Sequence, residues 1–159
     1  MRHLLLQLND THIDELISRL DSNILHSGAF LDSLSLEHTS TVKRACFITF
    51  TLARHIILRE WQLAATLDIL AGRDTILNAS AGAGKTMFII ILPMLVKPGS
   101  ISITVFSLKR LVSPQAAKLG RYGLRAAIVN EDTSHDHELF DAILGGYYDH
   151  VHISPEQLQ

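Results

Sequence analysis

The sequence lacks the features of several protein classes. Its 159 residues include one cysteine, Cys46, which excludes an internal disulfide framework and favours a reducing compartment. Burial as a small apolar side chain is the ordinary role of such a cysteine, and a reactive thiol is the alternative. Charged residues are only 19% of the chain against 47% hydrophobic residues, a balance typical of a folded globular protein rather than a disordered one.

Long hydrophobic runs are also missing. The most apolar stretch, residues 87–96, is ten residues long and contains Pro93. Because a membrane-spanning helix needs about 20 apolar residues, this stretch predicts a buried helix, and we expect no membrane partner. The opening "MRHLLLQLND" has only a three-leucine run, shorter than the apolar core of a secretory signal. These patterns favour an intracellular protein.

Two adjacent segments each lack charge of one sign, the first acidic and the second basic. Residues 97–128 contain six basic side chains and no acidic one, whereas residues 129–159 contain seven acidic side chains and no lysine or arginine. The asymmetry favours a strip that faces a polyanion, although chance clustering on a solvated helix remains open. The basic residues are Lys97, Lys109, Arg110, Lys118, Arg121 and Arg125.

The hydrophobic pattern changes near residue 59. Residues 1–58 are mostly helical in pattern, with one helix capped at Asp10 or Thr11, a second after Ser40, and a loop or short helix between them. From residue 59 onward, predicted helices over 59–72, 84–96, 108–123 and 134–146 alternate with short strands over 75–79, 101–106, 125–129 and 150–154. We expect a turn near Pro114. This alternation predicts an α/β fold with a parallel sheet flanked by helices.

The stretch "NASAGAGKT", residues 78–86, follows a predicted strand and precedes a predicted helix. Gly82 and Gly84 permit close approach of the backbone to a phosphate, and Lys85 can reach the β- and γ-phosphates. The Thr86 hydroxyl can contact Mg²⁺. A glycine turn that only caps a helix is the alternative, but it does not explain Lys85 and Thr86. The predicted phosphate-binding residues are Ala79, Ser80, Ala81, Gly82, Ala83, Gly84, Lys85 and Thr86, with Ala79 where G-x-x-x-x-G-K-[ST] begins with glycine.

The residues before this loop carry a family resemblance. Arg59, Gln62 and the G-R-D turn at 72–74 resemble the opening of RecQ-like DNA helicases of superfamily 2, of the DEAD/DEAH type. The resemblance implies that Arg59 and Gln62 belong to the ATP site and that Gln62 reads adenine, whose edge a glutamine amide can pair with. Gln62 stands 23 positions before Lys85, a spacing similar to that in the family, and this favours the ATP-site role over the alternative of an ordinary exposed helix residue. The implied fold is a partial first RecA-like P-loop domain over residues 59–159, preceded by a helical extension over residues 1–58.

Two later segments extend the resemblance to nucleic acid. "TVFSLKRLV" is similar to a family motif that contacts single-stranded DNA, although Leu108 replaces the usual proline. The ending "HVHISPEQLQ" resembles a second DNA-contacting motif. The implied partners are ATP with Mg²⁺ and single-stranded or partly duplex DNA, and the implied location is nuclear. The implied DNA-binding residues are Ser107, Lys109, Arg110, Ser154, Pro155 and Glu156.

The sequence contains no D-E-x-H or D-E-x-D segment, the carboxylate pair that the family uses to hold Mg²⁺ and orient water. We therefore expect the ATP-binding portion of a 3′-to-5′ DNA helicase, without unwinding by this chain alone and with an exposed apolar sheet edge that makes it marginally stable. The alternatives are a truncated protein that binds nucleotide or nucleic acid without hydrolysis, and an unrelated phosphate-loop enzyme such as a kinase. The histidine pairs at 135/137 and 150/152 have i, i+2 spacing, which would place each pair on one face of a strand. They favour packing or surface roles over zinc.

Overall fold

The computed structural model describes residues 4–5, 7–20, 24–25, 28–53, 56–97, 99–107 and 109–158, with the backbone alone at 88–89 and 109–111. By its internal contacts the chain divides into two compact units, Met1–Pro98 and Gly99–Gln159. The boundary between the units does not coincide with the one expected from the resemblance at residues 58/59. Each unit is described separately below.

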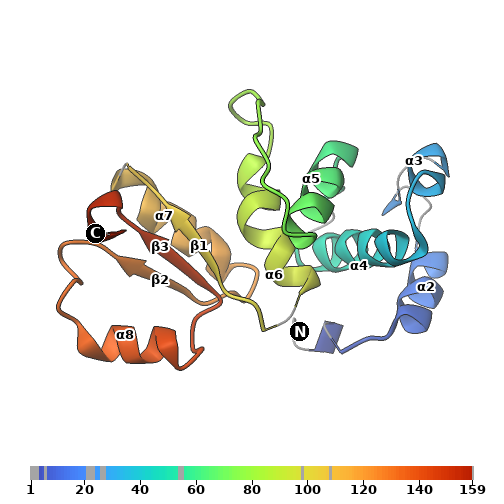
Figure 1. The fold of residues 1–159 in the computed structure, drawn as a ribbon. Coiled ribbons are helices and arrows are strands. Elements are labelled where there is room, and N and C mark those ends of the chain that lie inside the picture. The colour runs from blue at the N-terminus through green and yellow to red at the C-terminus, as the bar shows by residue number, and fades with distance from the viewer. Residues whose placement is uncertain are drawn as a thin grey trace. The chain divides into compact units, whose positions relative to one another are not determined.

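The first unit is helical (Figure 1). Two of its helices begin where a small polar side chain accepts a hydrogen bond from the first turn: Asn9 accepts from His12 N, and Ser35 from His38 N. The first cap lies next to the one predicted at Asp10 or Thr11, whereas α4 begins at Leu36, before the start predicted after Ser40. The elements are α2 (Asp10–Arg19), α3 (Gly28–Asp32), α4 (Leu36–Leu52), α5 (Glu60–Leu70), the π-helical turn η2 (Met87–Ile91) and α6 (Leu92–Val96).

Helix α4 forms the centre of this unit, since α2, α5 and α6 all pack against it. Its buried face includes Ile48, which meets a core that also contains Ile91 and Leu95. The predicted buried helix over 87–96 is confirmed. Its first part is π-helical and ends at Ile91, two residues before Pro93, which has no N–H to donate. Cys46 is buried in α4, as expected for a packing residue, and burial raises the pKa of its thiol to about 12.

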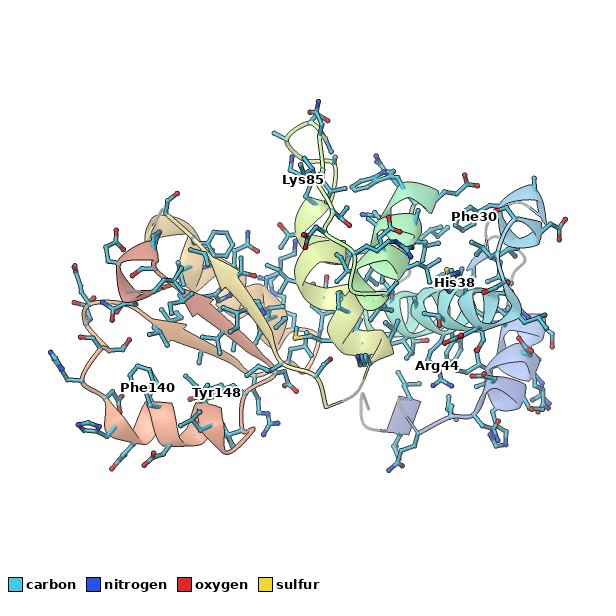
Figure 2. The ribbon with its side chains drawn as sticks, viewed as in Figure 1. Phe30, His38, Arg44, Lys85, Phe140 and Tyr148 are labelled. Atoms are coloured by element: carbon cyan, nitrogen blue, oxygen red, sulfur yellow. The ribbon has the colours of Figure 1, made fainter. Side chains whose placement is uncertain are left out.

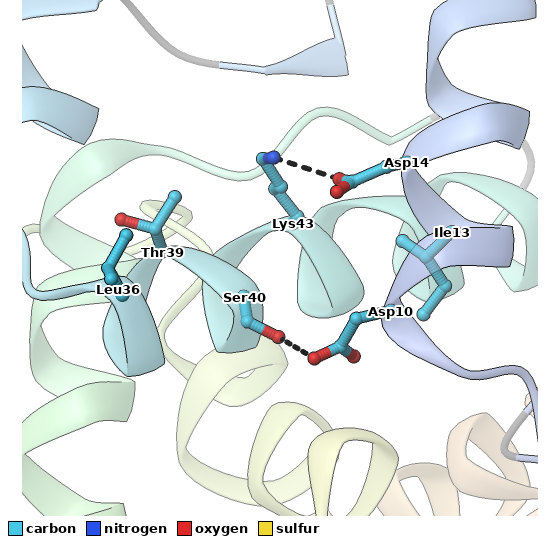
Figure 3. Close-up of a pocket in the computed structure, with 7 residues that line it drawn as sticks. All are labelled: Asp10, Ile13, Asp14, Leu36, Thr39, Ser40 and Lys43. Carbon is cyan, nitrogen blue, oxygen red and sulfur yellow. Dashed lines mark hydrogen bonds and ion pairs between the residues drawn. The ribbon is translucent and has the colours of Figure 1, made fainter.

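Helices α2 and α4 are joined by polar contacts around a hollow of about 190 Å³ (Figure 3). Lys43 Nζ lies 2.8 Å from Asp14 Oδ1, and Ser40 Oγ donates to Asp10 Oδ2 at 2.5 Å. The hydrogen bond from Ser40 and the guanidinium of Arg44 lower the pKa of Asp10. Because the charged groups of the hollow pair with one another, we interpret it as a helix-to-helix contact.

The second unit is a three-stranded parallel sheet with helices (Figure 1). The strand order is β1-β3-β2, so β3 hydrogen-bonds to both neighbours. The predicted alternation of strands and helices is confirmed over this part of the chain. The elements are β1 (Ser102–Val105), α7 (Lys109–Gly120), β2 (Ala126–Val129), α8 (His137–Leu144), β3 (His150–Ile153) and the 3₁₀ turn η3 (Pro155–Leu158).

The two faces of this sheet have different character. On one face, Ala127, Val129 and Val151 form a small apolar core, which Phe140 of α8 and Tyr148 help to cover (Figure 2). The other face carries His150 and His152, both fully buried. Edge strand β1 is less protected, because Ile103 is 63% exposed and Val105 47% exposed. The expected exposed apolar edge is therefore present in the described sheet.

Two expected features of secondary structure are wrong. Residues 75–79 form no strand, although their exposure alternates as in a strand; a strand needs a partner, and no described segment pairs with them. The expected turn near Pro114 is also absent, because α7 runs continuously through this proline. Among the described residues, no helix combines the length and apolarity that crossing a bilayer requires.

Candidate functional site

The predicted phosphate loop lies in the first unit, on a segment that extends away from α5 and α6 (Figure 1). Helix α5 ends at Leu70, followed by Gly72 with a left-handed φ of 73°. Residues 73–80 then run without regular structure, and a turn over 81–83 leads into the next helix. The loop therefore precedes a helix as predicted, but it does not follow a sheet strand.

Two glycines give the loop its path. Gly82 has φ 79° and Gly84 has φ 87°, values that side-chain-bearing residues rarely adopt. A Cβ at Gly82 would meet no atom within 4 Å, so this side of the backbone is open to a ligand. A Cβ at Gly84 would lie 2.8 Å from Gln62 Nε2. Gly82 therefore suits close approach of a ligand, whereas Gly84 makes room for Gln62.

Lys85 folds back over the loop that precedes it. Its ammonium donates to the carbonyl oxygens of Ala79 and, at 2.9 Å, of Ser80. Figure 2 shows Lys85 on the extended segment. The same side chain lines a concave hollow of about 590 Å³ together with Arg73 and Asp74. Arg73 forms an ion pair with Asp68 at 2.5 Å. Lys85, by contrast, contacts only neutral carbonyl oxygens among the described residues.

The loop also presents backbone donors. The N–H groups of Ala81, Gly82 and Gly84 donate to no other group among the described residues, whereas Ala83 N donates to Ser80 O at 3.3 Å. Such N–H groups at the start of a helix, near a lysine, are suited to binding an anion. Thr86 lies at this helix start and is half-buried, so its hydroxyl belongs to the same end of the loop.

Gln62 links α5 to the loop. Its Oε1 accepts from Arg59 N at 2.8 Å, which caps α5, and its Nε2 donates to Gly84 O at 3.2 Å. The side chain is only 5% exposed, so it is not the ordinary exposed helix residue of the alternative interpretation. The amide of Gln62 thus lies beside the loop. Its role in reading adenine stays a prediction. Of the two hydrogens on Nε2, one is not used in these two bonds.

The two predicted DNA-contacting segments meet at one edge of the sheet in the second unit. Ser107 follows β1 and Ser154 follows β3, and these strands are parallel neighbours with Val105 opposite Ile153. The pairing continues past the strand ends, where Phe106 N donates to Ile153 O at 3.1 Å. Lys109 and Arg110 begin α7 at the same end, while Pro155 and Glu156 form η3.

The basic strip is not one continuous surface of the second unit. Helix α7 separates Lys109 and Arg110, in its first turn, from Arg121 and Arg125, which follow its last residue. Arg125 is engaged at that far end: its Nε lies 3.5 Å from Asp149 Oδ2 and its guanidinium covers the Tyr147 ring at 4.6 Å. Lys109 and Arg110, at the start of α7, stay the predicted residues for phosphate contact.

Among the described residues, no group of three or more histidine, cysteine, aspartate or glutamate side chains is arranged to hold a metal ion. Histidines 135 and 137 are exposed, whereas 150 and 152 are buried in the sheet. The predicted placement of the second pair on one strand face is confirmed; of the two roles expected for these histidines, packing holds for this pair and surface exposure for the other.

Comparison of the chain with protein-family models, with curated proteins and with solved structures finds no match.

Proposed function

We propose that residues 78–86 bind the phosphates of ATP, with Mg²⁺ arriving on the nucleotide. The observation that carries the proposal is the combination of Lys85, whose ammonium contacts only carbonyl oxygens, with three neighbouring N–H groups that have no described acceptor. A phosphate oxygen would replace the carbonyls of Ala79 and Ser80 as the acceptor for Lys85. Charge-assisted hydrogen bonds of this kind are stronger than those to neutral carbonyls.

We further propose that the chain is the ATP-binding portion of a RecQ-like 3′-to-5′ DNA helicase. This proposal is supported by four sequence segments that occur in the family's order, and by the juxtaposition of the last two at one sheet edge. In this function Gln62 reads adenine, Thr86 contacts Mg²⁺, and Lys109 and Arg110 contact DNA phosphates.

A second candidate function is binding of nucleotide and nucleic acid without hydrolysis. The observation that favours it is the lack of a D-E-x-H or D-E-x-D segment in the sequence, because phosphoryl transfer to water needs metal-holding carboxylates. The two functions share the phosphate loop and differ in turnover.

Binding is tested by titrating Mg-ATP while following the fluorescence of Trp61, the single tryptophan, which adjoins Gln62. Lys85→Ala removes the ammonium and is expected to weaken binding at least about tenfold, since a hydrogen bond to a charged group contributes about 1.5–3 kcal/mol. Lys118→Ala removes a lysine from the other unit and serves as the charge-matched control. Equal affinity of wild type and Lys85→Ala would refute the phosphate-loop assignment.

The glycines allow a test with matched backbone strain. Gly82 and Gly146 have φ of 79° and 73°, and a Cβ at either would meet no atom within 4 Å. Alanine at either position should therefore cost similar folding free energy, about 1 kcal/mol. Only Gly82→Ala is expected to weaken Mg-ATP binding. If both substitutions weaken it equally, the effect is one of stability.

Hydrolysis separates the two candidate functions. Phosphate release from Mg-ATP is measured with and without single-stranded DNA, using Lys85→Ala as the inactive reference. Lysine-dependent turnover stimulated by DNA would support an ATPase within this chain, whereas binding without turnover would favour the second function. DNA binding itself is checked by its salt dependence, which Lys109→Ala should reduce by about one unit of log–log slope.

A further inference from the structure

The carboxyl ends of the three strands surround a cavity of about 280 Å³ in the second unit. Its wall includes Phe106 after β1, Ile128 of β2, His152 of β3 and Val112 of α7. In parallel sheets, ligands characteristically bind outside the carboxyl ends of the strands. The cavity shares no residue with the phosphate loop.

His152 is the unusual member of this wall. Its side chain is 0% exposed, yet its Nε2 has no hydrogen-bond partner among the residues that the structure describes. Burial of a polar atom without a partner is unfavourable, and most buried polar groups in native proteins are satisfied. The Phe106 ring lies 5.3 Å from the His152 ring, between centroids, so the wall presents two aromatic side chains.

A string of hydrogen bonds fixes the orientation of His152. Ser102 Oγ lies 2.6 Å from His150 Nδ1, and His150 Nε2 lies 3.3 Å from His152 Nδ1. Ser102 and His150 are register partners in adjacent strands, so the sheet itself sets this alignment. A histidine held at Nδ1 has Nε2 as its remaining polar atom, and here that atom belongs to a side chain of the cavity wall.

Both imidazoles are neutral at pH 7. Burial, reinforced by the neighbouring His152, lowers the pKa of His150 to about 3, and burial lowers the pKa of His152 to about 4. Each ring therefore carries one hydrogen, and two arrangements satisfy the string. If Ser102 donates, His152 Nε2 is an N–H donor; if Ser102 accepts, His152 Nε2 is an acceptor. His152 Nε2 can therefore pair with either an acceptor or a donor of a ligand.

The rest of the wall defines the ligand's charge and size. Asp132 is the one charged residue among the described residues of the wall, and it is acidic, which disfavours phosphates and carboxylates. Asn130 Oδ1 accepts a hydrogen bond from Asp132 N at 2.9 Å, which leaves the amide hydrogens of Asn130 as the donors that it can offer to a ligand. A volume of about 280 Å³ lies near the lower end of small-molecule sites, which run from roughly 300 Å³ upward.

We propose that this cavity binds an uncharged heteroaromatic base, which stacks against Phe106 and hydrogen-bonds to His152 Nε2. A heteroaromatic base matches the two aromatic side chains of the wall, the small volume and a polar atom able to donate or accept. Such a base can come from a free nucleoside or from an unstacked nucleotide of a single strand. The proposal does not depend on ATP binding in the first unit.

The test follows the side-chain nitrogens of His152 by NMR in the full-length ¹⁵N-labelled chain. Adenosine is titrated first, then adenosine monophosphate, then a short oligodeoxyadenosine. We expect adenosine to shift the His152 Nε2 resonance with saturation, and the monophosphate to bind at least about threefold more weakly because of Asp132. A response to the oligonucleotide alone would support the proposal with a strand as the source of the base. No shift with any of the three at millimolar concentration would overturn it.

Variants separate recognition from folding. His152→Leu removes the ring nitrogens and is expected to weaken adenosine binding at least tenfold, as measured by calorimetry. Val151→Ala changes the residue of β3 that precedes His152 and lies on the opposite face, and it should leave the affinity within about twofold. If His152→Leu does not fold, His152→Gln keeps a polar group and should fold but bind more weakly. Unchanged affinity in a folded His152 variant would refute the role of His152.

Lys85→Ala provides the final separation, since it disables the phosphate loop but leaves the cavity intact. Its His152 resonance should respond to adenosine as in wild type, so the cavity proposal and the ATP proposal can fail independently. A loss of the adenosine response in this variant would count against a separate site.

Discussion

In the helical unit the candidate site is built from exposed backbone, whereas in the sheet unit it is built from buried side chains. The phosphate loop depends on the φ angles of Gly82 and Gly84 and on the N–H groups beside them. The cavity depends on the side chains of His152 and Phe106, whose rings pack against each other in its wall. Changes in the loop should therefore affect binding more than stability, and changes in the sheet should affect both together.

The aromatic residues make this contrast measurable. The single tryptophan, Trp61, lies in the helical unit, while all three tyrosines, at 122, 147 and 148, lie in the sheet unit. Tryptophan fluorescence therefore reports on one unit and tyrosine near-ultraviolet dichroism on the other. The four predictions that follow run from the largest expected effect to the smallest.

Acid should destabilise the sheet unit first. Below about pH 6.5 the histidines of the unfolded chain take up protons, but folded His152 and His150 stay neutral until about pH 4 and 3. The unfolded state binds more protons in this window, so stability falls as the pH decreases from about 6.5. Urea unfolding followed by the tyrosine signal at pH 7.5, 6 and 5 measures the effect. His152→Leu should flatten the dependence and Val151→Ala should not; equal slopes would contradict the assignment.

Gly84→Ala should cost more stability than Gly82→Ala. Both place a Cβ on a left-handed residue, but at Gly84 that atom would also lie 2.8 Å from Gln62 Nε2. We expect a loss of about 2 kcal/mol or more for Gly84→Ala and about 1 kcal/mol for Gly82→Ala. Thermal unfolding followed at Trp61 compares them. A larger loss at Gly82 would mean that the Gln62 contact is not tight.

Gln62→Leu should loosen the start of α5. The change removes the bond that caps Arg59 N and the bond to Gly84 O while keeping similar volume. The expected loss in the free energy of unfolding is about 1–3 kcal/mol, because the partners are left without a hydrogen bond in a part-buried place. The tyrosine signal of the other unit, measured in the same samples, serves as the internal reference. Mg-ATP titration of the variant also tests whether adenine recognition needs the amide.

Lys43→Met should have the smallest effect. Lys43 pairs with Asp14 at 2.8 Å, but the two side chains are 30% and 53% exposed, so water and salt screen the attraction. We expect a change of less than about 1 kcal/mol, measured by urea unfolding at low and high salt. A loss of several kcal/mol that vanishes at high salt would mean that the α2–α4 contact depends on this pair.

The sequence predicted those elements whose signals are local. Helices α2, α4 and α5 follow from apolar periodicity, and the strands of the second unit from short apolar runs between turns. The spacing between Gln62 and Lys85 favoured a role for Gln62 in the ATP site, and its amide contacts Gly84 O of the loop. These features depend on residues within a few turns of one another or on a motif.

The misses come from long-range partners. Residues 75–79 have the pattern of a strand, but whether a strand forms depends on a neighbour elsewhere in the chain. The i, i+2 spacing of His150 and His152 placed them on one face, while their burial depends on β3 lying between β1 and β2. The division of the basic strip likewise depends on α7 continuing through Pro114 and carrying Arg121 away from Lys109.

The hydrogen bond between Gln62 and Gly84 joins two residues that are 22 positions apart and closes a loop between them. Its ends are held at the start of α5 and at the start of the next helix, while Ile76, within it, is 99% exposed. Because the entropic cost of closing a flexible loop grows only slowly with its length, residues inserted near Ile76 should lower the stability of the helices only slightly. This tip is therefore a permissive point for inserting a peptide tag.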